Sequence, residues 1–318
     1  MKDNNNYKEA LNLIKNSRYI LVLTHINPDA DTLSCALALS NYFYENNIKH
    51  KVVNKMDKLP RSVDFLNRFD KITTQLPKFY DLVIYVDCGD QDRPSIDIDN
   101  SVDIINIDHH QSNDSFGRYN FVDDTKASTA EVLYNFFIKN DMNISKDTAQ
   151  CLYCGIYDDS LQFSTPRTDA STFDIVNNLV EFGVEPSYVA NMLTKRASLA
   201  KYRLLPRILD SLELHCEGEV ATIYVLDSWL KQSGADYREC EDAVNMILSI
   251  DVVQIAIFLR VSNGKTRVSL RSKQKDITYI AKAFNGGGHT LASGCSVETL
   301  DVIKAKDMII EYIKKEEI

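Results

Sequence analysis

The 318-residue sequence predicts an α/β protein, with a doubly wound parallel sheet in an N-terminal domain and a smaller α/β fold in a C-terminal domain. In the first half, short apolar runs alternate with segments of helical pattern, which is typical of parallel strands joined by crossover helices. A helical region that is poor in glycine follows at 169–214, and strand-like segments return after it. We therefore expect domains at 1–190 and 215–318, with 169–214 as a helical connector.

The elements of the N-terminal domain are expected where apolar residues gather between polar ones. The run YILVL predicts a buried strand, because it is apolar throughout and bounded by polar residues. The segment at 55–75 contains Pro60 and alternating charges, so we expect it to be irregular or to form short helices. Strands are expected at 19–23, 50–54, 81–86 and 102–107, and helices at 7–16 and 34–44.

The connector and the C-terminal domain have a different pattern. We expect the connector helices to break between Gly183 and Pro186, and again at Pro206, because proline lacks the amide hydrogen that a helix needs. The pair Asn263-Gly264 separates two strand-like runs and predicts a β-hairpin. Strands are expected at 219–226, 252–261 and 265–272, and a last helix at 297–315.

Composition limits the classes of function. The net charge of −9 argues against a protein that coats long nucleic acid along a basic face. The N-terminus is polar, no apolar run approaches the ~20 residues that span a membrane, and the seven cysteines are scattered, which favours a cytoplasmic protein. Cys151 and Cys154 form a C-x-x-C, but no second pair follows at zinc-site spacing, so we expect two buried thiols in a helix.

Candidate metal ligands follow the first strand. His25, Asp29 and Asp31 lie within seven residues, in the turn between that strand and the next helix. Carboxylates held this close repel one another unless a positive charge lies between them, and imidazole with carboxylate suits Mn²⁺, Mg²⁺ or Co²⁺. The alternative is structural: Asp31 would cap the helix, and His25 would be an ordinary loop residue.

The third and fourth expected strands also end on residues of ligand type. One ends at Asp87, and the other ends at the triplet Asp108-His109-His110. The carboxyl ends of parallel strands meet at one edge of a sheet, and ligands bind there. Three such coincidences favour a metal site over three unrelated turns.

These motifs resemble those of the DHH phosphoesterases. The His-x-x-x-Asp-x-Asp pattern, the single aspartate and the Asp-His-His triplet match the first three motifs of that family, and GIYDDS at 155–160 matches the fourth. The alignment makes Asp159 the ligand and Asp158 its neighbour, although the choice between adjacent acids stays open. The segment ASTAE is also similar to the family and is expected to open a helix with Ser128 or Thr129 as its cap.

The C-terminal domain extends the resemblance over nearly the whole chain. The segments VSLRS and NGGGHTLASG are similar to the S-x-R-S and G-G-G-H-x-x-A-x-G patterns of the DHH-associated C-terminal domain. The sequence departs from the usual P-D-G-D-A-x-G-S, because Ala30, Ser34 and Cys35 replace two glycines and a serine. No residue of metal-ligand type is lost.

The resemblance implies a two-metal phosphoesterase, with Mn²⁺ favoured and Mg²⁺ or Co²⁺ as alternatives, in which a bridging hydroxide attacks phosphorus. Asp87 would bridge the two ions, Asp108 would orient a histidine, and His110 would contact a phosphate oxygen or protonate the leaving group. The implied metal ligands are His25, Asp29, Asp31, Asp87, His109 and Asp159. The residues implied to hold substrate, in a cleft between the domains, are Arg271, Ser272, Gly286, Gly287, Gly288 and His289.

Within the family, the chain resembles the oligoribonucleases (nanoRNases) that are also phosphatases of 3′-phosphoadenosine 5′-phosphate (pAp). That resemblance implies short RNA oligonucleotides, linear dinucleotides and pAp as substrates, with no long duplex nucleic acid and no membrane as partner; a homodimer is left open. The alternatives within enzymes are a RecJ-like single-strand exonuclease and an inorganic pyrophosphatase. The alternative from another class is a non-catalytic nucleotide-binding regulator. The glycine-rich loop with its histidine argues against a pyrophosphatase, and the short acidic chain argues against long DNA.

Overall fold

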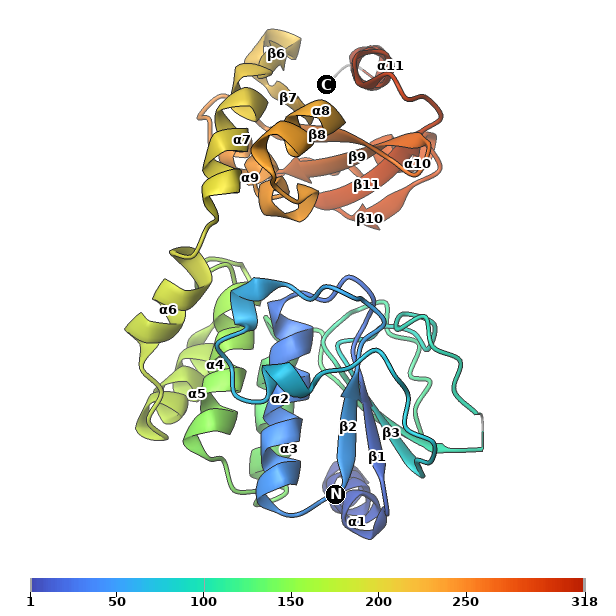
Figure 1. The fold of residues 1–318 in the computed structure, drawn as a ribbon, viewed down its shortest axis with the longest axis vertical. Coiled ribbons are helices and arrows are strands. Elements are labelled where there is room, and N and C mark those ends of the chain that lie inside the picture. The colour runs from blue at the N-terminus through green and yellow to red at the C-terminus, as the bar shows by residue number, and fades with distance from the viewer. Residues whose placement is uncertain (1, 100, 317–318) are drawn as a thin grey trace. The chain divides into compact units, whose positions relative to one another are not determined.

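The computed structural model describes residues 2–99 and 101–316, and the chain folds into two compact units, Met1–Arg196 (unit 1) and Ala197–Ile318 (unit 2) (Figure 1). Unit 1 contains an all-parallel sheet of five strands, and unit 2 contains a mixed sheet of six. The predicted α/β class, with a parallel N-terminal sheet and a smaller α/β C-terminal fold, is confirmed. Within the described residues, no helix is both long enough and apolar enough to cross a bilayer.

The sheet of unit 1 has the strand order β2-β1-β3-β4-β5. The order changes direction between β1 and β3, because the chain adds β2 on one side of β1 and β3 on the other. Ligands of open parallel sheets bind outside the strand carboxyl ends at such a switch point. The strands are β1 (Ile20–Leu23), β2 (His50–Val53), β3 (Leu82–Val86), β4 (Asp103–Asp108) and β5 (Tyr119–Val122).

Both faces of this sheet are buried, and the side chains of β1 alternate between them. Ile20 and Val22 pack into the core that includes the helices α2, α3 and α4, which stand together beside the strands in Figure 1. Leu21 and Leu23 face the opposite side, where irregular segments supply Ile96 and other apolar residues. The helices of unit 1 are α1 (Lys2–Asn16), α2 (Ala30–Glu45), α3 (Thr129–Lys139), α4 (Lys146–Asp159), α5 (Ala170–Glu181) and α6 (Pro186–Thr194), with 3₁₀ turns at Arg61–Val63 and Phe69–Lys71.

The sheet of unit 2 has the order β10-β11-β9-β8-β7-β6, in which only β7 and β8 run parallel. One face packs on α10 and α11, and part of the other packs on α7 and α9. The strands are β6 (Glu213–His215), β7 (Val220–Val225), β8 (Ile255–Ser262), β9 (Lys265–Ser272), β10 (Gly287–His289) and β11 (Ala292–Val297). The helices are α7 (Leu199–Asp210), α8 (Asp227–Ser233), α9 (Ala243–Leu248), α10 (Thr278–Ala283) and α11 (Val302–Lys315), with 3₁₀ turns at Cys216–Gly218 and Tyr237–Cys240.

Two local predictions are confirmed by their geometry. The hairpin between β8 and β9 turns through Asn263 (φ 52°) and Gly264 (φ 80°), and positive φ at both positions is what a type I′ turn requires. Cys151 and Cys154 are fully buried in α4. The thiols therefore occupy the helical core position expected of small apolar side chains.

The predicted break at Pro206 is wrong. Pro206 lies inside α7, which continues to Asp210. Leu204 and Ile208 on either side of it are fully buried in the core of unit 2, so packing holds the helix together where the missing amide would weaken it. The strand β5 was not predicted, because only Phe121 of its four residues is buried and the alternating pattern is too short to stand out.

Candidate active site

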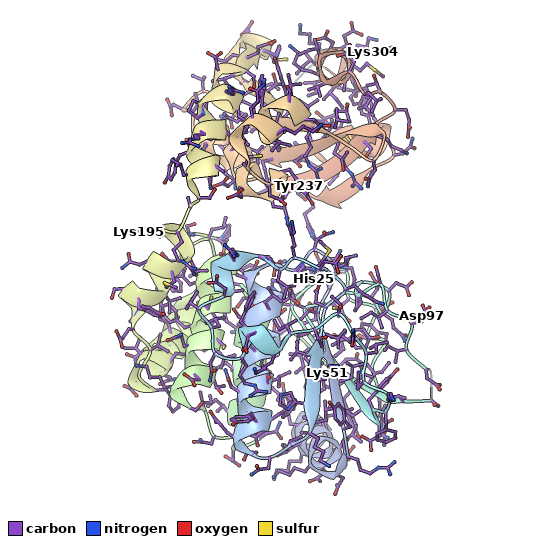
Figure 2. The ribbon with its side chains drawn as sticks, in the orientation of Figure 1. His25, Lys51, Asp97, Lys195, Tyr237 and Lys304 are labelled. Carbon is purple, nitrogen blue, oxygen red and sulfur yellow. The ribbon has the colours of Figure 1, made fainter. Side chains whose placement is uncertain are left out.

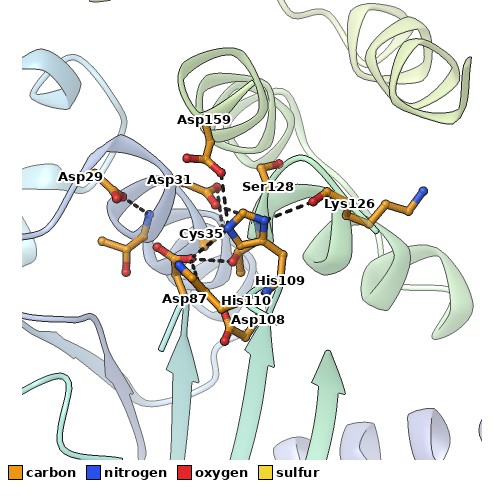
Figure 3. Close-up of polar contacts among 12 residues, drawn as sticks. Asp29, Asp31, Cys35, Asp87, Asp108, His109, His110, Lys126, Ser128 and Asp159 are labelled. Carbon is orange, nitrogen blue, oxygen red and sulfur yellow. Dashed lines mark hydrogen bonds and ion pairs between the residues drawn. The ribbon is translucent and has the colours of Figure 1, made fainter. Parts of the chain in front are cut away.

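The residues expected to bind metal come together at the carboxyl edge of the unit 1 sheet. His25 follows β1, Asp87 follows β3 and His109 follows β4, so all three lie around the switch point. Figure 2 marks His25 at the strand ends, and Figure 3 shows the acidic and imidazole groups gathered there. The gathered residues are His25, Asp29, Asp31, Asp87, Asp108, His109, His110 and Asp159.

One group of possible ligands forms around His25. Its Nε2 lies 3.3 Å from Oδ2 of Asp87 and 3.6 Å from Oδ2 of Asp29. These three residues offer ligand atoms that all lie within 4.8 Å of one another. Asp29 is also the N-cap of α2, because its carboxylate accepts the backbone N–H of Thr32 at 3.0 Å. The cap of this helix is thus Asp29, and the alternative that Asp31 caps it is wrong.

A second group forms around His109. Its Nε2 lies 3.4 Å from Oδ2 of Asp159 and 3.8 Å from Oδ1 of Asp87. Asp31, in the first turn of α2, completes the group, and its ligand atom lies within 4.8 Å of those of His109 and Asp159. Asp158 belongs to neither of these two groups. The two oxygens of Asp87 therefore point toward different groups of ligands.

Each of the two histidines is held with one ring nitrogen turned into the site. Nδ1 of His25 lies 2.9 Å from the carbonyl oxygen of Ile26, and Nδ1 of His109 lies 3.2 Å from that of Lys126. A carbonyl only accepts, so Nδ1 carries the hydrogen in both rings when this bond forms. In the neutral ring, Nε2 then carries the lone pair and faces the carboxylates, which is the arrangement that metal-binding histidines use.

The carboxylates of the site crowd one another in a buried place. Burial, and then the charges of Asp87, Asp29 and Asp158, raise the pKa of Asp159 to about 8. Burial and the same kind of repulsion raise the pKa of Asp31 well above its ordinary value. Divalent cations between the groups would remove this penalty, so the donor set fits metal ions in both charge and atom type.

The N-terminus of α3 supports two of these carboxylates. The backbone N–H of Thr129 donates to Oδ2 of Asp31 at 2.7 Å, and that of Ala130 donates to Oδ1 at 3.1 Å. The hydroxyl of Thr129 donates to Oδ1 of Asp87 at 2.8 Å. Ser128 caps the helix, which leaves the Thr129 side chain free for Asp87. Helix N-termini favour negative charge, so this contact fixes the position of Asp31 and offsets part of the cost of burying its charge.

Gly155 is required where α4 passes Asp31. A Cβ at this position would lie 2.5 Å from Oδ1 of Asp31 and 2.9 Å from Cβ of Ala130. Glycine inside a helix costs about 1 kcal/mol relative to alanine. The close approach of α4 to the site explains why a glycine stands in the middle of this helix.

Asp87 itself has an unusual backbone. Its φ is 59°, in the left-handed region that non-glycine residues rarely adopt. Its N–H donates to the carbonyl of Ile107 at 2.9 Å, which ties the residue to the neighbouring strand. Strain of this kind concentrates at functional sites, where the surrounding structure holds it.

Asp108 belongs to none of the possible ligand groups but contacts His110, which forms a third such group with Asp87 and His109. Its Oδ1 accepts from Nδ1 of His110 at 2.7 Å and from the backbone N–H of His109 at 2.8 Å. Its Oδ2 accepts from Nδ2 of Asn113 at 2.6 Å. Asp108 is therefore fully bonded and buried, and it fixes the orientation of the His110 ring.

In unit 2, the sheet register brings the two sequence motifs of the C-terminal domain together. Arg271 on β9 lies opposite Ala292 on β11, and Ala292 lies opposite His289 on β10. This row places a guanidinium and an imidazole on either side of a small residue. Ser272 is the next residue along β9, so it belongs to the opposite face, where it is buried and its hydroxyl has no hydrogen-bond partner within the described residues.

The three glycines of the loop have different roles. A Cβ on Gly286 would collide with the backbone oxygen of Gly294, and one on Gly288, whose φ is +144°, would lie 2.6 Å from that of Ala292. A Cβ on Gly287 would have no heavy atom within 4 Å. Gly286 and Gly288 are thus required by packing, whereas Gly287 is free of that requirement.

Both units of the chain are similar to known protein families. Residues 19–156 match the DHH family, N-terminal domain, and residues 217–315 match the DHHA1 domain. A Streptococcus mutans protein named "Probable bifunctional oligoribonuclease and PAP phosphatase NrnA" is 31% identical over 304 residues, which cover 92% of this chain and 94% of that protein. The chain belongs to the DHH family.

A second curated protein and a solved structure are also similar to the chain. The Bacillus subtilis protein named "Bifunctional oligoribonuclease and PAP phosphatase NrnA" is 24% identical over 288 residues, covering 89% of this chain and 90% of that one. Among solved structures, an exopolyphosphatase-related protein from Bacteroides fragilis has a similar fold, with a TM-score of 0.90, 22% identity and coverage of 98% and 97% of the two chains. As a DHH phosphoesterase, the chain is a metal-dependent hydrolase of phosphoester bonds.

The sequence did not reveal every residue that this DHH site depends on. Thr129 was expected only as a possible helix cap, and its contact with Asp87 could not be read from a local pattern. Gly155 was noted only as part of a motif. A glycine at the centre of an otherwise helical segment was the available signal for a close approach.

Proposed function

We propose that this DHH phosphoesterase hydrolyses short oligoribonucleotides and linear dinucleotides to mononucleotides, and removes the 3′-phosphate of pAp. The names of the S. mutans and B. subtilis relatives, oligoribonuclease and PAP phosphatase, support this choice of substrates. Both relatives align with about nine tenths of the chain, so the support extends to unit 1 and unit 2 alike.

The proposed site holds two divalent ions, and the position of Asp87 is the observation that supports this number. Its Oδ2 faces His25 and its Oδ1 faces His109, so one carboxylate could serve both ligand groups. His25, Asp29 and Asp87 would hold one ion. The other ion would be held by Asp31, Asp87, His109 and Asp159. Mixed imidazole and carboxylate ligands favour Mn²⁺, with Mg²⁺ or Co²⁺ as alternatives.

When bound, the two ions would supply Lewis acidity and a hydroxide nucleophile near neutral pH. The chain contributes the positions of the remaining groups. Asp108 accepts from Nδ1 of His110, which leaves Nε2 of that ring free to contact a phosphate oxygen or to give its proton to the leaving oxygen as the P–O bond breaks. Thr129 and the N-terminus of α3 keep Asp87 and Asp31 in place during the reaction.

Unit 2 is proposed to bind the nucleotide part of the substrate. Arg271 can offer paired donors to a phosphate, and His289 lies in the same cross-strand row. Gly287 is exposed and a Cβ there would meet no heavy atom within 4 Å, so an anion can come close to this side of the loop.

The test is a substrate panel for the purified full chain, with Mn²⁺, Mg²⁺, Co²⁺ or a chelator. The panel contains di- to pentanucleotide RNA, long single-stranded RNA, duplex RNA, single-stranded DNA, pAp and pyrophosphate. We expect metal-dependent turnover that is highest on the shortest RNAs and on pAp. Equal efficiency on long RNA, DNA or pyrophosphate would contradict the proposal, and nucleotide binding without turnover in every metal would point to a regulator.

A further inference from the structure

The face of the unit 2 sheet that carries Arg271 has a second cationic region farther along the strands. Arg267, Ser269 and Arg271 alternate along β9 and therefore share one face. Arg260 of β8 lies directly opposite Arg267, and Ser296 of β11 lies opposite Arg267 on the other side. Three neighbouring strands thus bring two guanidinium groups and a hydroxyl into one row.

A hollow of about 320 Å³ lies over this part of the sheet. Between the rows of Arg267 and Arg271, the neighbouring strand β11 contributes Gly294, which lies opposite Ser269 and has no side chain to fill the space. The polar and glycine residues that line the hollow include Arg260, Arg267, Ser269, Asn285, Gly294 and Ser296.

The charges in this row are only weakly compensated by the protein, through one long ion pair between Arg260 and Glu241. Like charges directly opposite each other on adjacent strands destabilise a sheet. Arg260 stacks over the ring of Tyr237, 3.9 Å from its centroid, and its nearest carboxylate contact, to Glu241, is 3.9 Å long and so is no hydrogen bond. Arg267 forms no ion pair within residues 2–99 and 101–316. Donors of both guanidinium groups therefore remain available to an anion in the hollow.

We propose that Arg260 and Arg267, with the hydroxyls of Ser269 and Ser296 beside them, form a second phosphate-binding subsite for the short RNA substrate. This inference rests on the proposed function of unit 2 and extends it. Guanidinium groups bind phosphate through paired N–H donors, and two of them facing one hollow would bind a phosphodiester with its charge compensated. Relief of the Arg260–Arg267 repulsion adds to the free energy of binding.

The position of the subsite predicts which substrates use it. Four residues of β9 lead from Arg267 to Arg271, which is about 13 Å at roughly 3.3 Å per residue. A ligand that uses both rows must carry at least two phosphates. A dinucleotide with hydroxyls at both ends has a single phosphodiester, whereas a trinucleotide has two and a tetranucleotide three. The Arg260–Arg267 subsite therefore acts on tri- and tetranucleotides and has no phosphate to bind in a plain dinucleotide.

The experiment compares Arg267→Gln with Lys304→Gln in the full chain. Lys304 is exposed on α11, which covers the opposite face of the sheet (Figure 2), so the control makes the same charge change away from the hollow. Binding of di-, tri- and tetranucleotides with hydroxyls at both ends is measured in a chelator, and kcat/KM is measured with Mn²⁺. We expect Arg267→Gln to weaken tri- and tetranucleotide binding about tenfold. We also expect the slope of log Kd against log salt to fall by about 0.7 for these ligands, with the dinucleotide unchanged.

The results that would overturn the Arg260–Arg267 subsite can be told apart from those that would overturn the proposed function. An unchanged tetranucleotide affinity, or an equal loss for dinucleotide and tetranucleotide, overturns the subsite while leaving the proposed function intact. Wild-type chain that neither binds nor hydrolyses any of these RNAs overturns both. If Arg267→Gln does not fold, Arg267→Lys replaces it, because this variant keeps the charge but loses the paired donors. A loss of affinity for the tri- and tetranucleotide alone then supports the subsite, and wild-type affinity for them refutes it.

Discussion

Replacing Thr129 by valine removes one hydrogen bond to Asp87 and changes little else. The two side chains have nearly the same shape, and Thr129 is fully buried, so the fold should persist. Its backbone N–H still reaches Asp31, but the 2.8 Å contact of its hydroxyl with Oδ1 of Asp87 is lost. A hydrogen bond to a charged group contributes about 1.5–3 kcal/mol, which corresponds to a loss of roughly 10- to 150-fold in divalent-ion affinity.

The assay is competition between the protein and a fluorescent chelator for Mn²⁺, followed by turnover of a dinucleotide at saturating metal. Thr129→Ser is the matched control, because it keeps the hydroxyl and loses only a methyl group, and we expect it to retain most of the affinity. A folded Thr129→Val protein that binds Mn²⁺ within threefold of wild type, which is about 0.7 kcal/mol, would refute the positioning role of Thr129.

Three further changes test other parts of the molecule. Asp87→Asn should lower kcat by about three orders of magnitude or more and reduce the bound metal measured by elemental analysis, because an amide replaces the shared carboxylate; a folded variant with normal turnover would contradict the dinuclear site. Gly155→Ala places a Cβ 2.5 Å from Oδ1 of Asp31 and 2.9 Å from Cβ of Ala130, so activity should fall more than tenfold; the helix preference of alanine, about 1 kcal/mol, should offset only part of the loss in thermal stability. Arg271→Ala should raise KM for a dinucleotide with a 5′-phosphate by the equivalent of about 1.5–3 kcal/mol and spare a small activated phosphodiester; equal losses on both would assign Arg271 to the phosphate chemistry instead.

Part of the proposed metal site could be located from sequence, because several of its residues follow an apolar strand. In a parallel sheet all strands point the same way, so residues at their carboxyl ends meet regardless of their separation along the chain. His25, Asp87 and the Asp108-His109-His110 triplet are gathered in this manner. The hairpin at Asn263-Gly264 was equally predictable, because its conformation depends on the two residues that form it.

The contacts that hold the site together could not be predicted from sequence, because they join residues that are far apart along the chain. Thr129 and Asp87 are 42 positions apart, and Thr129 and Asp31 are 98 apart. The Arg260–Arg267 pair and the Arg271–His289 row likewise depend on strand register in unit 2. Apolar patterning specifies that a strand is buried, but the packing of whole helices and strands determines which distant side chains touch. Packing also explains why α7 continues past Pro206, because the residues on either side of this proline are buried.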